Sequence, residues 1–356
     1  MQNHEQTPET AGQTPHQLSF TGKGSEYFGI WIVNLLLSLI TLGIYSAWAK
    51  VRRMQYFYRN THLAGASFDY HGNPVSILKG RLIAIGMLVV YNLASQAHLY
   101  SGLVVGALLL CLLPRLLLKS LQFRLHNSSY RGLRFRFTGQ LKGAYITFLA
   151  LPLAALFSLY LLAPFCHQRI KRYQHNNSAF GQTHFSFNAP VSAFYTLYLK
   201  ILGVAVLGFA LAGFASFALF GNLFASFSGR KDPQSILLLS LIPLAMFFVA
   251  SFFIRPFMEA RLQNLIWNNT QLGPHRFIST VSARKLFAIM LTNLIGVALT
   301  LGLYRPFAVA RLHKYRAESL TMLAAGSLED FMSSTEADIN AVGEETAEMF
   351  DVDLAL

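Results

Sequence analysis

Residues 47–70 read AWAKVRRMQYFYRNTHLAGASFDY, and the pattern within them returns along the chain. It begins at a helix end with Pro, an aromatic or both, and has a basic residue four or five places on. An aromatic or Leu, then Asn-Thr or Asn-Ser, Gly and Phe follow. Five copies begin at residues 47, 114, 164, 256 and 306, and the fifth stops after Tyr315. Each follows an apolar segment of helix length. Because internal repeats determine architecture before other signals do, we infer that one membrane-edge module was multiplied.

Composition places the chain in a membrane. Of its 356 residues 53% are apolar and 13% charged, about half the charged share of a soluble domain. Runs without charge cover residues 27–49, 82–114, 143–168, 201–229, 233–254 and 286–304. About 20 apolar residues span a bilayer core, and a polar break at 95–102 divides the longest run into a hairpin. The sequence thus predicts an all-α polytopic membrane protein with about seven apolar helical segments.

The net charge of +13 is unevenly distributed. All Lys and Arg lie between Lys23 and Arg316, whereas most acids lie in the tails. Basic residues beside apolar helices are typical of a cytoplasmic membrane face, so we expect anionic lipid as a partner and no nucleic acid. Residues 1–17 lack Lys and Arg, so no cleavable signal peptide is expected, and the oligomeric state is left open.

Short tracts with alternating Phe follow the first four modules, at 67–72, 134–139, 184–189 and 276–280. Such alternation predicts β-strands, which cannot lie unpaired in lipid. An Asn-Thr or Asn-Ser step precedes each tract, and we expect these pairs to be turn or capping residues. We expect the strands in the basic loops at the membrane edge, pairing with one another.

The predicted domain plan has three parts. A disordered polar head (1–17) precedes a repeat-built membrane domain (18–320), and an acidic flexible tail (321–356) follows. The membrane domain contains a first repeat (27–139), a second (140–280) and a partial third (285–317).

Two topologies compete. If all seven segments span, modules three and four lie opposite the others, and Lys and Arg divide 19 to 10. If segments 27–48, 143–163 and 286–307 are re-entrant, all modules share one face and the division is 27 to 2. The usual positive bias of the cytoplasmic side favours the second, although the segments look long enough to span.

Residues 20–72 resemble the YjgN family of bacterial inner-membrane proteins. The resemblance is carried by Phe20-Thr21-Gly22, the helix end at Thr41–Tyr45 and the Asn60-Thr61 step, and it extends over about residues 18–320. It implies a location in the Gram-negative inner membrane and no particular activity.

Three groups of residues are candidates for binding or anchoring. A ring of cations suits phosphate or carboxylate, or each cation snorkels to lipid headgroups: Arg52, Lys119, Arg169, Arg261 and Arg311. Aromatic anchors at the interface are expected at Trp48, Tyr56, Tyr173 and Tyr315. Asn34 and Asn293 lie inside matching apolar helices, where they join helices or line a permeation path.

No catalytic motif, metal-ligand spacing or cofactor fingerprint is present, so neither an enzyme nor a cofactor is expected. Two functions remain. A transporter or pore for an anionic or amphiphilic solute predicts a polar cavity between segments 27–48 and 286–307. A non-transporting scaffold that binds anionic lipid or a protein partner through its basic cytoplasmic face predicts a helix bundle without such a cavity.

Overall fold

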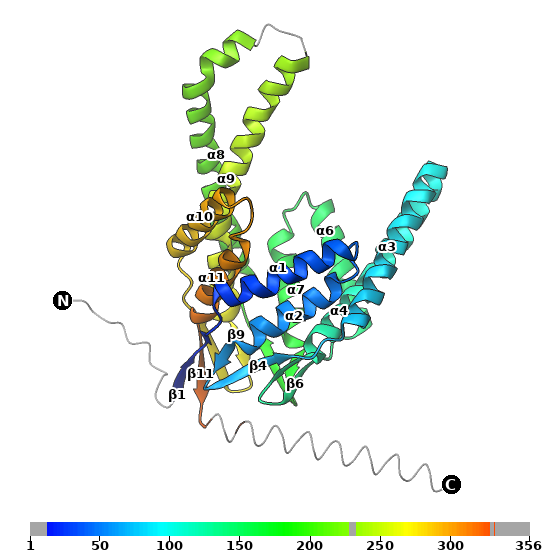
Figure 1. The fold of residues 1–356 in the computed structure, drawn as a ribbon, viewed down its shortest axis with the longest axis vertical. Coiled ribbons are helices and arrows are strands. Elements are labelled where there is room, and N and C mark those ends of the chain that lie inside the picture. The colour runs from blue at the N-terminus through cyan, green and yellow to red at the C-terminus, as the bar shows by residue number, and fades with distance from the viewer. Residues whose placement is uncertain (1–12, 228–232, 328–330, 332–356) are drawn as a thin grey trace, which may run out of the picture.

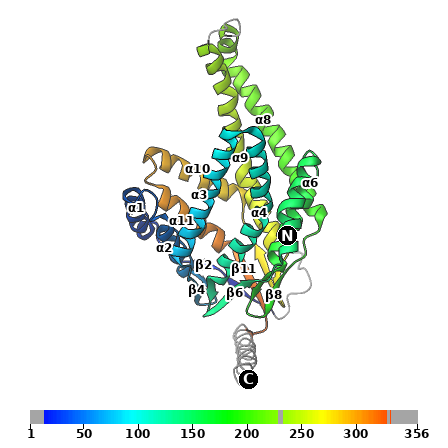
Figure 2. The same ribbon diagram turned by 90° about the vertical axis from the view of Figure 1, so that its right-hand side faces the viewer.

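The structure, a computed structural model, describes residues 13–227, 233–327 and 331. Its strands gather at one end of the molecule, and helical hairpins of unequal length rise from them (Figures 1 and 2). The chain repeats one unit, which is a helical hairpin followed by a β-hairpin. Each copy of the sequence pattern lies where the second helix of a unit leads into its strands.

The helical hairpins differ in length from module to module. In chain order they are α1 (Gly24–Ile40) with α2 (Ser46–Arg59); α3 (Pro74–Ala97) with α4 (Leu99–His126); α5 (Leu141–Tyr145), the π-helical stretch η1 (Ile146–Ala150) and α6 (Leu151–Phe157) with α7 (Ala163–Asn176); α8 (Val191–Phe227) with α9 (Pro233–Trp267); and α10 (Ala283–Leu299) with α11 (Arg305–Glu318).

The strands come in pairs after each helical hairpin. They are β3 (Thr61–Leu63) and β4 (Ala66–Tyr70), β5 (Ser128–Tyr130) and β6 (Leu133–Phe137), β7 (Ser178–Phe180) and β8 (Thr183–Phe187), β9 (Thr270–Leu272) and β10 (His275–Ser279), and finally β11 (Leu320–Ala325), which pairs with the N-terminal β1 (Gln13–Gln17); β2 (Ser19–Phe20) follows β1.

These strands form one antiparallel sheet that closes on itself. The order is β1-β11-β10-β9-β8-β7-β6-β5-β4-β3-β2. Only Leu18 separates β1, at one edge, from β2, at the other, and its N–H donates to the carbonyl of Leu320 at 2.9 Å. The fifth module therefore continues beyond Tyr315 into β11, and the start of the chain completes its hairpin.

Phenylalanines line the interior of the barrel. Phe68, Phe135, Phe185 and Phe277 occupy the same place in four successive hairpins, and their ring centroids lie 6.3–6.5 Å apart from one hairpin to the next. Alternate side chains of a strand point to opposite faces, so these rings face inward. The prediction that the Phe tracts are strands is confirmed, but they do not pair with one another. Each pairs with the shorter strands on either side, as β6 does with β5 and β7.

The Asn-Thr or Asn-Ser step ends each module's second helix. In module one, Asn60 Nδ2 donates to the carbonyl of Tyr56 (2.8 Å) and Thr61 Oγ1 to that of Phe57 (2.7 Å). Modules two to four repeat both bonds. The side chains satisfy carbonyls that the helix end leaves free, which confirms the predicted capping role.

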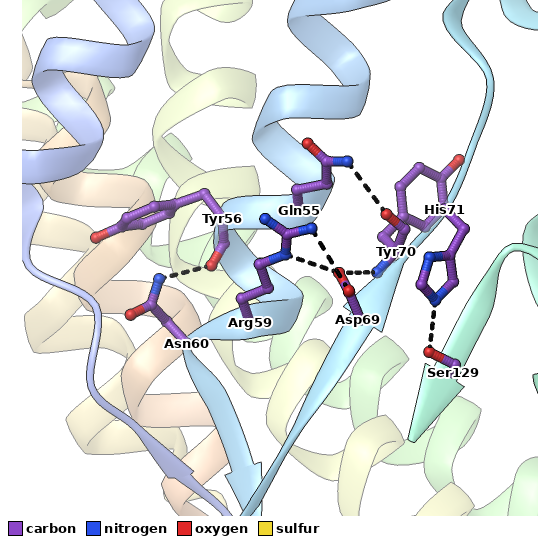
Figure 3. Close-up of polar contacts among 8 residues, drawn as sticks. All are labelled: Gln55, Tyr56, Arg59, Asn60, Asp69, Tyr70, His71 and Ser129. Carbon is purple, nitrogen blue, oxygen red and sulfur yellow. Dashed lines mark hydrogen bonds and ion pairs between the residues drawn. The ribbon is translucent and has the colours of Figure 1, made fainter. Parts of the chain in front are cut away.

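Polar contacts then tie each cap to the barrel, as Figure 3 shows for module one. Arg59 Nε lies 2.8 Å from Asp69 Oδ1, which joins α2 to β4. His71 Nε2 lies 2.8 Å from Ser129 Oγ, which joins module one to module two. The helical hairpin of module one is therefore anchored to the sheet and to the module beside it.

The predicted fold class is wrong in two respects. The protein is not all-α, because the strands form a near-closed eleven-stranded barrel. Among the described residues only three helices, rather than seven, are long and apolar enough to span: α3, α4 and the 21 residues Val191–Leu211 of α8.

The seven-segment count failed because apolar runs continue through turns. Segments 27–48, 143–163 and 286–307 are each bent into a short helical hairpin, α1–α2, α5–α7 and α10–α11. Backbone at positive φ makes the bends, as at Leu42 (49°) with Gly43 (90°) and Leu301 (50°) with Gly302 (97°).

The barrel also decides between the two topologies. All five modules contribute strands to one sheet, and the two sides of a bilayer cannot share a sheet. The arrangement with modules three and four on the opposite face is excluded, and all modules share one face.

Two domain boundaries need correction. Residues 13–17, predicted as part of a disordered head, form β1, and the predicted tail begins with most of β11, through Ala325. The rest of the predicted head (1–12) and most of the predicted tail (328–330 and 332–356) lie outside the described residues.

Candidate functional site: a basic cavity beside the barrel

The five predicted ligand cations lie on five different helices. Three of them lie over an aromatic ring in or next to their own helix, with the guanidinium carbon 5.0–5.7 Å from the ring centroid: Arg52 over Tyr45, Arg169 over Phe165 and Arg261 over Phe257. Arg311 Nη1 donates to Thr292 Oγ1 at 2.9 Å, and Lys119 is exposed. None of the five lines the large cavity described below.

The repeated tyrosines fasten each short helical hairpin internally. Tyr56 donates its hydroxyl proton to the carbonyl of Lys23 at 2.7 Å, and Tyr173 donates to that of Gln140 at 2.9 Å. The third copy makes the same link in module five, where Tyr315 bonds to the backbone of Ser282. Each bond ties the second helix to the residue just before the first, a role that the sequence did not indicate. Trp48, the remaining predicted anchor, is half-buried and stacks on Tyr45, with the two ring centroids 6.1 Å apart.

The two matching asparagines are both buried, but their surroundings differ. Asn293 Nδ2 donates to the carbonyl of Ala308 at 3.1 Å, which joins α10 to α11. Asn34 lines a cavity. The Oδ1 atom of each is buried without a hydrogen-bond partner in the protein.

That cavity has a volume of about 810 Å³ and lies between α1–α2, the start of α3 and α11. Tyr27, Trp31 and Asn34 form its α1 wall, and Arg305 with Pro306 enters from α11. These residues belong to segments 27–48 and 286–307. A polar cavity is therefore present where the transport hypothesis predicted one.

Its charge is strongly positive. Lys50, Arg53, Arg81 and Arg305 line it, and no Asp or Glu is among its lining residues. Arg81 of α3 donates to the hydroxyl of Ser46, which holds its guanidinium group against the first residue of α2. Like charges around one concave site raise the local concentration of anions. The arrangement suits phosphate or carboxylate, which guanidinium groups bind through paired hydrogen bonds.

The remaining titratable groups leave this positive field unopposed. Burial, aided by Arg316 and Arg53, lowers the pKa of His313 to about 4, so the imidazole is neutral at pH 7. Burial raises the pKa of Tyr27, and the nearby charges of Arg53 and Arg305 oppose that rise. An anion entering the cavity thus meets four cations and several neutral polar side chains, Tyr27 and His313 among them.

The sequence pattern does not reveal the cavity cations, because they do not recur in every module. The candidates were chosen for recurring in every module, and recurrence marks residues that build the module. Arg53 directly follows the repeated Arg52, and Arg81 lies seven residues into an apolar spanning helix. A charge at that depth was the available signal, because ionisable residues inside membrane helices usually serve a site.

Comparisons with known proteins give a family and a location. The family described as "Bacterial protein of unknown function (DUF898)" matches residues 15–349. The chain is 35% identical over 151 residues to "Inner membrane protein YjgN" of Salmonella typhimurium, which covers 41% of this chain and 38% of that protein. The protein of the same name in Escherichia coli K12 is 32% identical over 139 residues, which covers 39% of this chain and 35% of the relative.

The matched region thus spans less than two fifths of the length of these relatives. No solved structure matches the chain. The family match covers most of the sequence, the relatives are named as inner-membrane proteins, and three described helices are long enough to span. The chain accordingly belongs to the DUF898 family of bacterial proteins and is a multi-pass protein of the inner membrane.

Proposed function

We propose that this protein binds an anionic amphiphile from the cytoplasmic leaflet, with the anionic headgroup in the basic cavity. The observation that carries the proposal is the convergence of Lys50, Arg53, Arg81 and Arg305 without a lining carboxylate. The positive bias of the barrel side makes that side cytoplasmic, where anionic lipids are exposed to it.

The surroundings of the cavity favour an amphiphile over a small free anion. Apolar side chains of α1 and α3 beside it are exposed, among them Val33, Leu36 and Leu82 (45%, 51% and 57%). A headgroup held by the cations leaves its hydrocarbon tail against these surfaces. Binding then combines charge-assisted hydrogen bonds with burial of apolar area.

Transport of the bound amphiphile is the finer activity that we propose. It is favoured by the position of the cavity between segments 27–48 and 286–307 and by the unpaired Oδ1 of Asn34 at its wall. Asn34 lies ten residues, or about 15 Å, along α1 from its start at Gly24. The polar wall thus extends over more than half the length of α1.

Binding is tested with purified protein in nanodiscs that contain phosphatidylcholine and a minor fraction of phosphatidylglycerol. Native mass spectrometry counts the anionic lipid that stays bound. A double variant, Lys50→Gln with Arg53→Gln, removes two cavity charges. The control, Arg52→Gln with Arg115→Gln, removes two exposed charges outside the cavity.

We expect the cavity variant to lose affinity for phosphatidylglycerol tenfold or more, since a hydrogen bond to a charged group contributes about 1.5–3 kcal/mol. The control should lose less than about threefold, because its two charges do not converge on one cavity. Equal losses in both variants would contradict the cavity and favour a diffuse basic surface. Competition by glycerol phosphate as strong as that by the lipid would show that a free anion is the ligand.

Transport has a separate readout. Fluorescent phosphatidylglycerol in the outer leaflet of proteoliposomes is bleached by dithionite, and the rate at which protected lipid becomes accessible reports movement between leaflets. Faster exchange with the protein than with the Lys50→Gln, Arg53→Gln variant supports transport. Unchanged exchange together with retained binding would leave the protein as a lipid-binding scaffold.

A further inference from the structure

The three short helical hairpins end in turns of one design. α1–α2 turns at residues 41–45, α5–α7 at 158–162 and α10–α11 at 300–304. A hydroxyl residue begins each turn: Thr41, Ser158 and Thr300. Two residues at positive φ follow it in every copy, and in module three both are non-glycine, Leu159 and Tyr160.

Every backbone N–H of these turns is satisfied within its own hairpin. In module one the N–H groups of residues 41, 42 and 43 donate to the carbonyls of Leu37, Leu39 and Ser38, in that order. The N–H of residue 44 donates to the carbonyl of Thr41, and that of residue 45 to the hydroxyl of Thr41. The N–H of residue 46 donates to the carbonyl of Gly43. Residues 158–163 and 300–305 repeat the same six-bond pattern. The hydroxyl therefore accepts the one N–H that no carbonyl reaches.

The turns place large apolar side chains outward. Leu42, Leu159 and Leu301 are 94%, 84% and 95% exposed, although each has a positive φ that disfavours a side chain. Three internal copies of a strained, fully exposed leucine gain nothing from packing inside the protein. Irregular backbone in contact with lipid is unfavourable unless its polar groups are paired, and here they are paired.

The turn between α3 and α4 is different. It contains the polar residues Gln96, His98 and Ser101. The N–H of Tyr100 donates to Nδ1 of His98, and the hydroxyl of Ser101 donates to the carbonyl of His98. Its helices have 24 and 28 residues, against 17 for α1 and for α10. A polar turn at the end of longer helices is suited to the water beyond the bilayer.

We propose that the three short hairpins dip into the cytoplasmic leaflet and return without crossing the membrane, with Leu42, Leu159 and Leu301 as their deepest side chains. The repeated arginines set the depth. Arg52, Arg169 and Arg311 each lie nine residues after the second positive-φ residue of the turn, which is about 13 Å of helix. With the arginines at the headgroups, the tips reach about the middle of a hydrocarbon core of roughly 30 Å.

The longer hairpin gives the matching length for a full crossing. Lys119 occupies the repeated basic position in α4 and lies 21 residues after His98, or about 31 Å. With Lys119 at the same headgroups, the α3–α4 turn emerges on the far side. The proposal does not depend on the occupant of the basic cavity.

Single cysteines test the depth of each turn. Cys111 and Cys166 are first replaced by Ser and Ala, and then Leu42→Cys, Leu301→Cys, Gln96→Cys and Arg131→Cys are made one at a time. A membrane-impermeant maleimide is applied to spheroplasts and to inverted membrane vesicles. A fluorophore or spin label at each cysteine then reports contact with doxyl groups at defined depths along the lipid chains.

We expect Gln96→Cys to react from the periplasmic side and Arg131→Cys, in the barrel, from the cytoplasmic side. Leu42→Cys and Leu301→Cys should react at least tenfold more slowly than both from either side, with strongest contact to doxyl groups near the chain ends. Periplasmic labelling of the tips would show that the hairpins cross. Cytoplasmic labelling as fast as that of Arg131→Cys would show that they do not insert. Either result overturns the proposal, whether or not lipid binds the cavity.

Discussion

Replacing Thr41 with Val removes one hydroxyl from a hairpin tip and keeps the shape of the side chain. The hydroxyl accepts the N–H of Tyr45 at 2.9 Å and donates to the carbonyl of Leu37 at 2.7 Å. In lipid nothing replaces the hydroxyl, so the N–H of Tyr45 is left unpaired. An unsatisfied buried donor costs about 1–3 kcal/mol. At a tip in water, a water molecule would take the place of the hydroxyl, and the cost would be a few tenths of a kcal/mol.

The assay is equilibrium unfolding in mixed phospholipid–detergent micelles, followed by tryptophan fluorescence. Thr41→Ser is the matched variant, because it keeps the hydroxyl and loses only a methyl group. Ser101→Ala is the control in the polar α3–α4 turn, where we expect about 0.5 kcal/mol or less. We expect Thr41→Val to be less stable than Thr41→Ser by about 1–3 kcal/mol. Equal stability of the two variants would refute the placement of the tip in lipid.

Three further predictions concern the barrel, the turns and pH. Phe180 lies in the barrel core and is only 2% exposed. Phe180→Ala should therefore lower the free energy of unfolding by about 3–5 kcal/mol, measured by the same unfolding titration. Gly302 has a φ of 97°, so Gly302→Ala should lower the unfolding free energy by about 1–2 kcal/mol, although a Cβ there meets open space. Burial lowers the pKa of His167, His175 and His313 to about 4, so the fold favours their neutral forms. Their contribution to stability is complete above about pH 6.5 and is lost as the pH falls toward 4, which thermal midpoints between pH 7.5 and 4.5 will measure.

Local patterns predicted local structure well. The alternation of Phe68 and its counterparts indicated strands, and the Asn60-Thr61 step indicated a helix cap, because both depend on neighbours within a few residues. The pairing of strands from different modules was also expected, since lipid cannot satisfy a strand edge. The charge count of 27 to 2 favoured the topology that the barrel requires.

The number of spanning helices was not predictable from hydropathy. Leu42 and Leu301 are as apolar as any spanning residue, so the run of hydrophobic residues conceals the turn. The Thr-Leu-Gly sequence at 41–43 and 300–302 marks a match between two apolar segments, but residue type alone does not indicate that the backbone turns there. Residue type alone does not report whether a hydroxyl caps a turn or faces a neighbouring helix.

The site was hidden for a different reason. Arg81 and Arg305 are far apart in the chain, and only the packing of α3 and α11 against α1–α2 brings them to one cavity. Repetition directed attention to Arg52 and Arg311, which lie outside that cavity. Asn34 was identified because a polar residue in an apolar helix is conspicuous without tertiary information.

Both proposals depend on all five modules lying on one side of the membrane. Ile278 of β10 and Thr321 of β11 are partners in the barrel, and they come from modules that a seven-span protein would place on opposite sides. In a background without native cysteines, Ile278→Cys with Thr321→Cys should form a disulfide when isolated membranes are treated with copper phenanthroline, whereas each single variant should not. Absence of that cross-link in protein that remains folded in the membrane would contradict the shared barrel, and with it the one-sided arrangement.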